Sequence, residues 1–591
     1  MKISPQIQLM LQYPFGTLPK SFYWTTGIRN AQIWDVLVKY NGNIMQEITS
    51  DFEITNVTIL NNGYAIMKIP RYNITQLATL KSVEYIEFPE VMQYIIEKAM
   101  TLICGTNLAS PQVGYGVTGK GIFFGSIDSG VDYTHPDFLN ADGTTRIAYL
   151  WDQTIAGNPP QGFNSGTEFT SEQINQALLL NDKSIVPSVD NLGHGTALAG
   201  VAVGNGAASD RTIWKGVAPE ATLIVVKVGQ EGEDEIQGLY RGPRNIEIMM
   251  ALKYITDKAL QMNKPVVILL GFGVNEGGHN GGSALEQYIN YVSEMWRVNV
   301  VVGTGNQANK DSHTSGDIIT GERKRVGIFI DDNQPYYFCT LWKSFVDAFG
   351  ISIISPSGER TPMLTRSEIN SNTIVGDTIV SVNFSTLSPT SQGEQILIFL
   401  DSFADAPVED GNWFIEIEGL EILDGEYDIW GESFDDVDRS LRFLQPVKEK
   451  TLTIPSTSVY VTSVAASASN GLQIASFSGW GYIQGGIVKP DITAPGVDVV
   501  APTPDPNMRY QSISGTSVAA SFVAGAYLLM LEFGINQVGD EYLYGDILKA
   551  YLLRSATRNK NMAYPNTQWG YGELCIRTAL REMSNLYDTI R

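Results

Sequence analysis

The segment GIFFGSI, residues 121–127, is a short apolar run bounded by glycine. Three similar runs follow it: TLIVVKV (222–228), KPVVILLGFG (264–273) and VNVVVGTGN (298–306). Such runs are typical of strands buried on both faces, as in a parallel sheet. Stretches with helical spacing lie between them, at 194–204, 246–261 and 284–296. This alternation predicts a doubly wound α/β domain, in which a site lies beyond the carboxyl ends of the strands.

The residues before this domain have a different pattern. Segments 33–41, 55–60, 64–70 and 83–88 are rich in β-branched and aromatic residues and are broken by turn signals, whereas 72–80 has helical spacing. Strands on both sides of one helix predict a small α+β unit.

Between residues 311 and 450 the alternation stops. Strand-like segments follow one another with no convincing helix among them, at 325–330, 336–342, 351–357, 378–384, 395–400, 413–420 and 440–447. This pattern predicts an all-β sandwich or jelly roll. Because the α/β pattern resumes near Val459, we expect the β unit to be inserted into one α/β domain. The predicted parts are 1–95, 96–313, 314–451 and 452–591.

Composition narrows the class of protein. The chain has 591 residues, too many for one core, and a formal net charge of −23. A surface this acidic, with no block of Lys and Arg, argues against nucleic-acid binding. The N-terminus, MKISPQIQLMLQYPFG, has no long apolar core, and no apolar stretch reaches about 18 residues without interruption. Neither a signal peptide nor a membrane-spanning helix is therefore expected.

The three cysteines, Cys104, Cys339 and Cys575, are odd in number and widely spaced. They form no CxxC pair, so we expect neither a disulfide framework nor a zinc site. The chain is accordingly expected to fold in a reducing compartment, or to fold without depending on bridges.

Three segments carry the candidate chemistry. Asp128 follows a buried strand in GIFFGSIDSGVDYTHPDF (121–138), His194 opens a helix in DNLGHGTALAG (190–200), and Ser517 precedes a small-residue helix in SISGTSVAASFVAGA (512–526). A serine hydroxyl becomes a nucleophile when a base takes its proton, histidine can be that base near neutrality, and a carboxylate can orient the imidazole. Taken singly, each residue is explained more simply as a turn residue, a helix cap or an ordinary side chain than as a catalytic residue.

Together the three segments resemble the active-site motifs of the subtilisin-like serine proteases, in the order Asp, His, Ser. The resemblance runs through most of residues 115–310 and 452–535, and it implies a subtilisin-like fold with Asp128, His194 and Ser517 as catalytic residues. It also implies that Asn306, in VVVGTGNQAN, stabilises the oxyanion. The cleft edges that would pair with extended substrate are Gly271, Phe272 and Gly273 on one side and Val228 and Gly229 on the other. One departure is Ser521-Phe522, where the family commonly has Pro-His.

The chain further resembles the germination-specific Csp proteases of clostridial spores. The resemblance rests on the N-terminal unit, the β insertion after Asn306, and the stretches GGHNGGSALE (277–286) and TLTIPSTSVYVTSVAAS (451–467). It implies a propeptide that chaperones and inhibits the protease and that stays bound in some members of the group after self-cleavage, here expected near Pro89–Lys98. It also implies an insertion that is a jelly roll and rigidifies the protease, and a cortex-hydrolase zymogen as protein substrate. We expect the insertion to add stability without chemistry, and the protein to be made in the cytoplasm and stored in the spore.

Other interpretations stay open from the sequence. The chain could be a catalytically silent subtilase-fold sensor or binding protein, or an intracellular subtilase without a spore role, and the N-terminal unit could be an unrelated interaction domain. Subtilases often hold Ca²⁺, but no Asp and Glu cluster has the spacing of a metal loop, so no metal or other cofactor is expected to be required.

Overall fold

The computed structural model divides into two compact units, Met1–Gln93 and Tyr94–Arg591. It describes the chain apart from residues 1, 4–6, 8–9, 12–31, 55, 61–62, 88–101, 107, 111–113, 210–212, 230–242, 244, 276, 333, 335, 368–369, 385–392, 403–406, 432–441, 469–470, 485–486 and 591. The predicted cleavage region Pro89–Lys98 lies outside the described residues, and the predicted boundaries at 95, 313 and 451 stay predictions.

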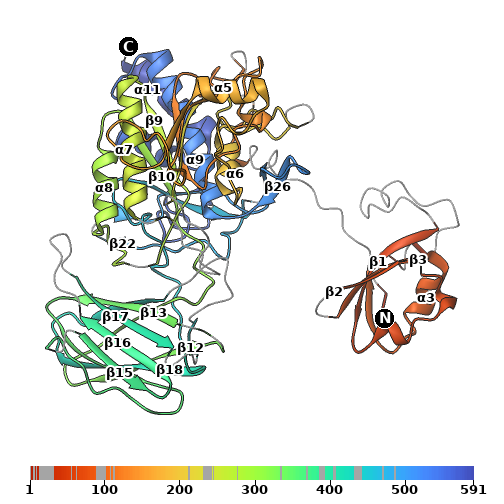
Figure 1. Cartoon of the computed structure of the whole chain (residues 1–591), viewed down its shortest axis with the longest axis vertical. Coiled ribbons are helices and arrows are strands. Elements are labelled where there is room, and N and C mark those ends of the chain that lie inside the picture. The colour runs from red at the N-terminus through yellow and green to blue at the C-terminus, as the bar shows by residue number, and fades with distance from the viewer. Residues whose placement is uncertain are drawn as a thin grey trace. The chain divides into compact units, whose positions relative to one another are not determined.

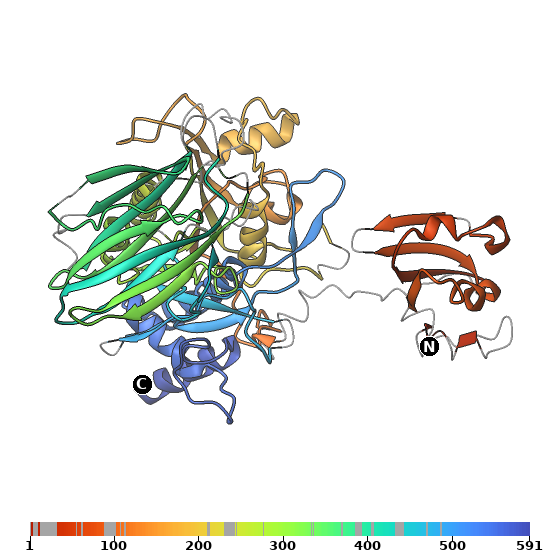
Figure 2. The same cartoon turned by 90° about the horizontal axis from the view of Figure 1, so that it is seen from below.

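The N-terminal unit is the predicted α+β fold. Its antiparallel sheet has the order β2-β3-β1-β4, and the strands are β1 (Ile33–Tyr40), β2 (Asn56–Leu60), β3 (Tyr64–Pro70) and β4 (Val83–Glu87). The short helix α3 (Ile74–Leu77) precedes β4 (Figure 2). Alternate residues of β1, among them Trp34, Val36 and Val38, are buried and form the core with Ile74 and Leu77.

The second unit is built on an eight-stranded sheet with the order β24-β21-β10-β9-β5-β8-β6-β7, in which only β6 and β7 pair antiparallel. Its strands are β5 (Phe123–Asp128), β6 (Ile147–Asp152), β7 (Thr167–Thr170), β8 (Thr222–Lys227), β9 (Val266–Leu270), β10 (Val298–Gly303), β21 (Thr462–Ser467) and β24 (Ile492–Pro495). The predicted doubly wound α/β domain is confirmed.

Helices cover both faces of this sheet, as the apolar strands require. On β8, Leu223 and Val225 pack in a core with α6 (His194–Val203) and α9 (Thr516–Leu531). The intervening Ile224 and Val226 pack in a second core with α7 (Asn245–Gln261) and α8 (Ala284–Ser293) (Figure 1). Because successive side chains of a strand point to opposite faces, one apolar run supplies both cores.

Helix α9 and the π-helical segment after it (Glu532–Val538) form the one helix of the described chain that is apolar and long enough to cross a membrane, Thr516–Val538. It lies inside the protein, with 89% of its apolar window buried. A central helix packed against α6, β9, β10 and β21 accounts for this composition.

The insertion is an antiparallel two-sheet sandwich. One sheet has the order β11-β19-β13-β17-β16-β15 and the other the order β14-β18-β12-β20. The strands are β11 (His313–Asp317), β12 (Arg323–Ile330), β13 (Tyr336–Ser344), β14 (Ala348–Ile354), β15 (Asn370–Val375), β16 (Thr378–Phe384), β17 (Gly393–Ser402), β18 (Gly411–Glu421), β19 (Glu426–Gly431) and β20 (Arg442–Phe443). The two sheets share one apolar core that includes Leu341, Ile351, Ile398 and Trp413, so the predicted inserted β domain is confirmed.

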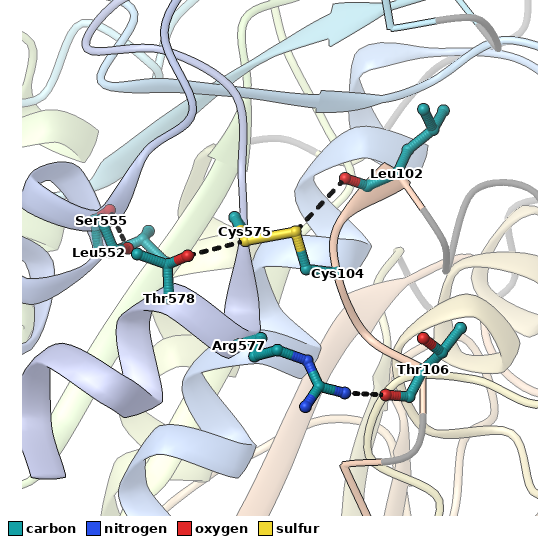
Figure 3. The surroundings of a disulfide bond; sticks show 8 residues. All are labelled: Leu102, Cys104, Thr106, Leu552, Ser555, Cys575, Arg577 and Thr578. Atoms are coloured by element: carbon teal, nitrogen blue, oxygen red, sulfur yellow. Dashed lines mark hydrogen bonds between the residues drawn. A yellow bond between two sulfur atoms is a disulfide. The ribbon is translucent and has the colours of Figure 1, made fainter. Parts of the chain in front are cut away.

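The expectation that no disulfide forms is wrong. Cys104 and Cys575 are bonded, with their Cα atoms 5.1 Å apart, and the bond joins the start of the second unit to the start of α11 (Ile576–Ile590) (Figure 3). Arg577 Nη2 donates to the carbonyl oxygen of Thr106 at 2.6 Å and helps to align the two segments. The cysteines are 471 residues apart, so only the tertiary fold makes them neighbours. Cys339 is free and buried in the insertion, where desolvation raises its pKa to about 12.

Glu573, two residues before this disulfide, makes the stability of the second unit depend on pH. Burial raises its pKa to about 7, and it accepts one hydrogen bond from Ser467 Oγ at 3.0 Å. A carboxyl group whose pKa is higher when folded contributes stability that is complete below its ordinary pKa, about 4.3, and is lost as pH rises through 7. The loss amounts to about 3 kcal/mol or less above pH 8.

Glu573→Gln should therefore unfold at a higher denaturant concentration than the wild type at pH 9 but not at pH 5. Denaturant unfolding of both proteins at the two pH values measures the difference. Equal pH dependence in both proteins would show that this carboxyl group does not titrate in the buried state.

Candidate active site

The three predicted catalytic residues meet at the carboxyl end of the central sheet. Asp128 is the last residue of β5, His194 is the first residue of α6, and Ser517 lies in the first turn of α9. His194 Nδ1 lies 2.8 Å from Asp128 Oδ1, and His194 Nε2 lies 3.2 Å from Ser517 Oγ. Since an ionised carboxylate only accepts, Nδ1 carries the proton and Nε2 is left to accept from the serine hydroxyl.

Asp128 is held as a buried acceptor. Its carboxylate is 2% exposed and accepts from the Ser129 backbone N–H at 2.7 Å as well as from His194. A Cβ at Gly271 would stand 1.8 Å from Asp128 Oδ2, so any larger residue there would displace the carboxylate. The His194 side chain is 41% exposed, which leaves its other face open to solvent or substrate.

Asp190 is a supporting residue that the sequence analysis missed. One of its carboxylate oxygens accepts from Ser129 Oγ and the Gly193 backbone N–H, and the other accepts from both the N–H and the hydroxyl of Thr196. These bonds fix the loop that leads into α6 and hold the first turn beside Asp128. The only sequence signal was its position at the start of DNLGHGT.

Asn306 lies beside the serine, as predicted. Its Oδ1 accepts from the Thr516 backbone N–H at 3.0 Å, which turns its Nδ2 group away from that contact. The position that a Cβ on Gly515 would occupy is 3.3 Å from Ser517 Oγ and 3.6 Å from Asn306 Nδ2. The hydroxyl group and the amide N–H donors therefore face a common space, which suits an oxyanion.

We expect Asn306→Ala to lower kcat by about 10²- to 10³-fold with little change in KM, because the lost donor acts on charge that develops in the transition state. Steady-state kinetics on a peptide substrate measures this split. Asn309→Ala, at an exposed position in the same loop, is the matched control. A loss confined to KM would contradict the oxyanion role.

A cavity of about 110 Å³ adjoins these residues. It is lined by His194, Leu270, Gly271, Phe272, Gly273, Gly303, Gly305, Asn306, Gln307, Thr453, Thr516 and Ser517. Three of the predicted substrate-edge residues, Gly271 to Gly273, thus lie at the cavity. Val228 and Gly229 are not among its lining residues; the Val228 N–H instead donates to the Asp128 carbonyl oxygen at 3.0 Å. Their role as the facing edge stays a prediction.

The departure at Ser521-Phe522 is accommodated in α9. Ser521 Oγ donates to the Ser517 carbonyl oxygen at 3.0 Å, and Phe522 is buried in the core. Within the described residues, no group of three or more His, Cys, Asp or Glu side chains is arranged to hold a metal ion.

Comparison with known proteins gives matches to two family models and to a solved structure. Residues 1–90 match the family model of the Csp protease B prodomain, and residues 119–362 and 439–572 match that of the subtilase family. The structure of the Clostridium perfringens CspB protease is 30% identical with a TM-score of 0.74, over 83% of this chain and 98% of that one.

Two relatives in sequence are also proteases. The minor extracellular protease Vpr of Bacillus subtilis is 24% identical over 554 residues, which are 87% of this chain and 60% of Vpr. A C5a peptidase of Streptococcus pyogenes is 37% identical over 113 residues, which are 18% of this chain and 9% of that protein. The chain thus spans less than two thirds of the length of these relatives. It belongs to the subtilase family of serine proteases, is related to the Csp proteases, and carries a Csp-type prodomain.

Proposed function

We propose that the chain is a serine endopeptidase in which Ser517 is the nucleophile, His194 the general base and then acid, and Asp128 the residue that orients the imidazole. The observation that carries this proposal is the placement of His194 between the other two, with both ring nitrogens within hydrogen-bond distance. Its membership of the subtilase family supports the same reaction.

In the proposed mechanism, Ser517 Oγ attacks the carbonyl carbon of the scissile peptide while its proton passes to His194 Nε2. The carbonyl oxygen becomes an oxyanion, which accepts hydrogen bonds from Asn306 Nδ2 and the Ser517 backbone N–H. His194 then gives its proton to the leaving amine, which departs and leaves an acyl group on Ser517. A water molecule next attacks this acyl group while His194 takes its proton, and His194 returns that proton to Ser517 Oγ as the acid product leaves. Asp128 stays ionised throughout and stabilises the imidazolium.

The first substrate we propose is the chain itself. The Csp-type prodomain match over residues 1–90 supports self-cleavage between this unit and the protease, in the range Pro89–Lys98, after which the prodomain is a partner of the protease. Mass spectrometry of the purified protein tests this. Two fragments are expected from the wild type and one intact chain from Ser517→Ala; a wild type that stays intact on storage would contradict self-processing.

The second substrate we propose is the zymogen of a spore cortex-lytic hydrolase, activated by limited proteolysis, with the protease stored in the spore. Similarity to the CspB protease of Clostridium perfringens supports this assignment. Incubating the wild-type protein with such a zymogen should release one defined fragment and hydrolase activity, whereas Ser517→Ala should release neither. Degradation of the zymogen to many fragments, or expression of the protease outside sporulating cells, would contradict it.

A further inference from the structure

Two histidines stack on one tryptophan where the insertion meets the catalytic domain. Trp430, on β19, stacks on His279 with ring centroids 4.1 Å apart and an interplanar angle of 10°. On His313 it stacks at 5.0 Å and 23°. All three side chains are at most 6% exposed. His279 belongs to the catalytic domain, and His313 is the first residue of β11, so the stack joins the two domains.

His279 lies between the two segments that form one side of the cavity. Its Nε2 is 2.9 Å from the Asn275 carbonyl oxygen, and its Nδ1 is within hydrogen-bond distance of the Leu452 carbonyl oxygen. Next to these contacts, Val274 and Ile454 exchange two backbone hydrogen bonds of 2.9 Å. The ring therefore braces the segment that follows the cleft glycines against the segment 452–454.

Burial lowers the pKa of His279 to about 4, so at neutral pH the ring is an uncharged aromatic group. Such a ring stacks on an indole without the cost of a buried charge. A neutral imidazole has one N–H and can donate to only one of the two carbonyl groups at a time. The stack with Trp430 is thus the other main contact that fixes the ring.

Thr453, between the braced residues, is packed tightly into the cavity wall. A Cβ at Gly273 would lie 2.3 Å from Thr453 Oγ1, and a Cβ at Gly305 would lie 2.4 Å from Thr453 Cγ2. The Thr453 N–H also donates to the Thr304 carbonyl oxygen at 2.9 Å. With no free space on either side, a shift of this segment changes the width of the cavity.

The insertion also holds the chain directly before this wall. Trp430 Nε1 donates to the Lys450 carbonyl oxygen at 3.0 Å, and Asp428 pairs with Lys450 Nζ at 2.8 Å. Asp428 also lies 3.1 Å from His313 Nε2. The segment 450–453 therefore contacts the insertion at its first residue, Lys450, and lines the cavity at its last residue, Thr453.

We propose that Trp430, stacked on His279 and His313, positions the segment 452–454, whose Thr453 lines the cavity, so that the inserted β domain sets which substrate side chain the cavity accepts. The inference rests on the proposed protease function, and it gives the insertion a part in specificity beyond the stability expected of it. Trp430, His279 and His313 are positioning residues, since they reach the cavity only through this segment.

The test compares Trp430→Leu with the wild type in two assays. A small fluorophosphonate probe reports the reactivity of Ser517 without filling the cavity, and its labelling rate should be unchanged. A mixture of peptides, with cut sites read by mass spectrometry, reports side-chain preference. Here Trp430→Leu should accept a broader set of side chains and lose about 10-fold or more in kcat/KM on the best wild-type peptide, mainly through KM.

Phe349→Leu is the matched control. Phe349 is buried in the core of the insertion against Tyr427, so its loss destabilises the same domain without touching the stack. Its cleavage profile should equal that of the wild type, and Trp430→Phe, which keeps an aromatic face, should restore much of the preference. If Trp430→Leu does not fold, His279→Asn carries the same assays; position 279 has φ +47°, which asparagine tolerates.

The outcomes separate the two proposals. If the probe fails to label the wild type, the proposed function is overturned and this inference with it. If the probe labels both proteins and their cleavage profiles are identical, the inference alone is overturned. If Phe349→Leu also accepts a broader set of side chains, the effect comes from loss of stability of the insertion as a whole. That result would also overturn the inference.

Discussion

Ser517→Ala should lower kcat by about 10⁶-fold, the size of loss that removing the nucleophile causes in subtilisin. The hydroxyl oxygen is the atom that bonds to the substrate carbonyl carbon, and it lies 3.2 Å from His194 Nε2, the atom that takes its proton. The loss should appear in kcat and in kcat/KM alike, since the removed interaction forms only on the way to the transition state. Steady-state kinetics on a peptide substrate, at protein concentrations measured by absorbance and with the lower limit set by hydrolysis in buffer, measures it.

The control for this change is Ser512→Ala, an exposed serine in the same motif, which should keep wild-type kinetics. The unfolding midpoint of Ser517→Ala should stay near that of the wild type, because the fold of α9 depends on its buried apolar residues. Residual self-cleavage in pure Ser517→Ala protein would contradict the assignment of the nucleophile.

Asp128→Asn should lower kcat by about 10⁴-fold while leaving the fold intact, a magnitude known from the same change in another serine protease. In the wild type the carboxylate accepts from His194 Nδ1 at 2.8 Å, which keeps the proton on Nδ1. An amide in its place can present N–H to Nδ1 and stabilise the other tautomer. His194 Nε2 would then carry a proton and could not accept one from Ser517.

The pH profile distinguishes this effect from a structural one. Raising the pH restores the productive tautomer of His194 only in part. The kcat of Asp128→Asn should therefore stay far below that of the wild type from pH 6 to pH 9. Asp132→Asn is the matched control in the same motif. Asp132 Oδ1 accepts from the backbone N–H and the hydroxyl of Thr134, and the residue lies outside the cavity lining. A loss of similar size in Asp132→Asn would place the effect in the motif's fold and not in the His194 tautomer.

The fold could be predicted where one physical constraint governs a local run of sequence. Strands β5, β8, β9 and β10 are buried on both faces, and unbroken apolar runs are the direct consequence. The three catalytic candidates could be predicted together because each stands at the end of a strand or the start of a helix. Such termini meet at one edge of a parallel sheet.

Features that depend on pairs of distant segments could not be predicted. The Cys104–Cys575 disulfide joins the two ends of the catalytic unit, and no spacing rule reaches over 471 residues. Thr453 lines the cavity because the chain leaving the insertion passes Gly273 and Gly305 at close range. The His279, Trp430 and His313 stack needs three segments at once, and each residue alone resembles an ordinary buried ring.

In the proposed mechanism, His194 and Asp128 make Ser517 an active nucleophile. To test this, the purified wild-type chain is incubated with a fluorophosphonate and digested, and the adduct is located by mass spectrometry. We expect one adduct on the peptide that contains Ser517, and none there in His194→Ala. An unlabelled wild-type protein, or an adduct on a different serine with Ser517 untouched, would contradict it.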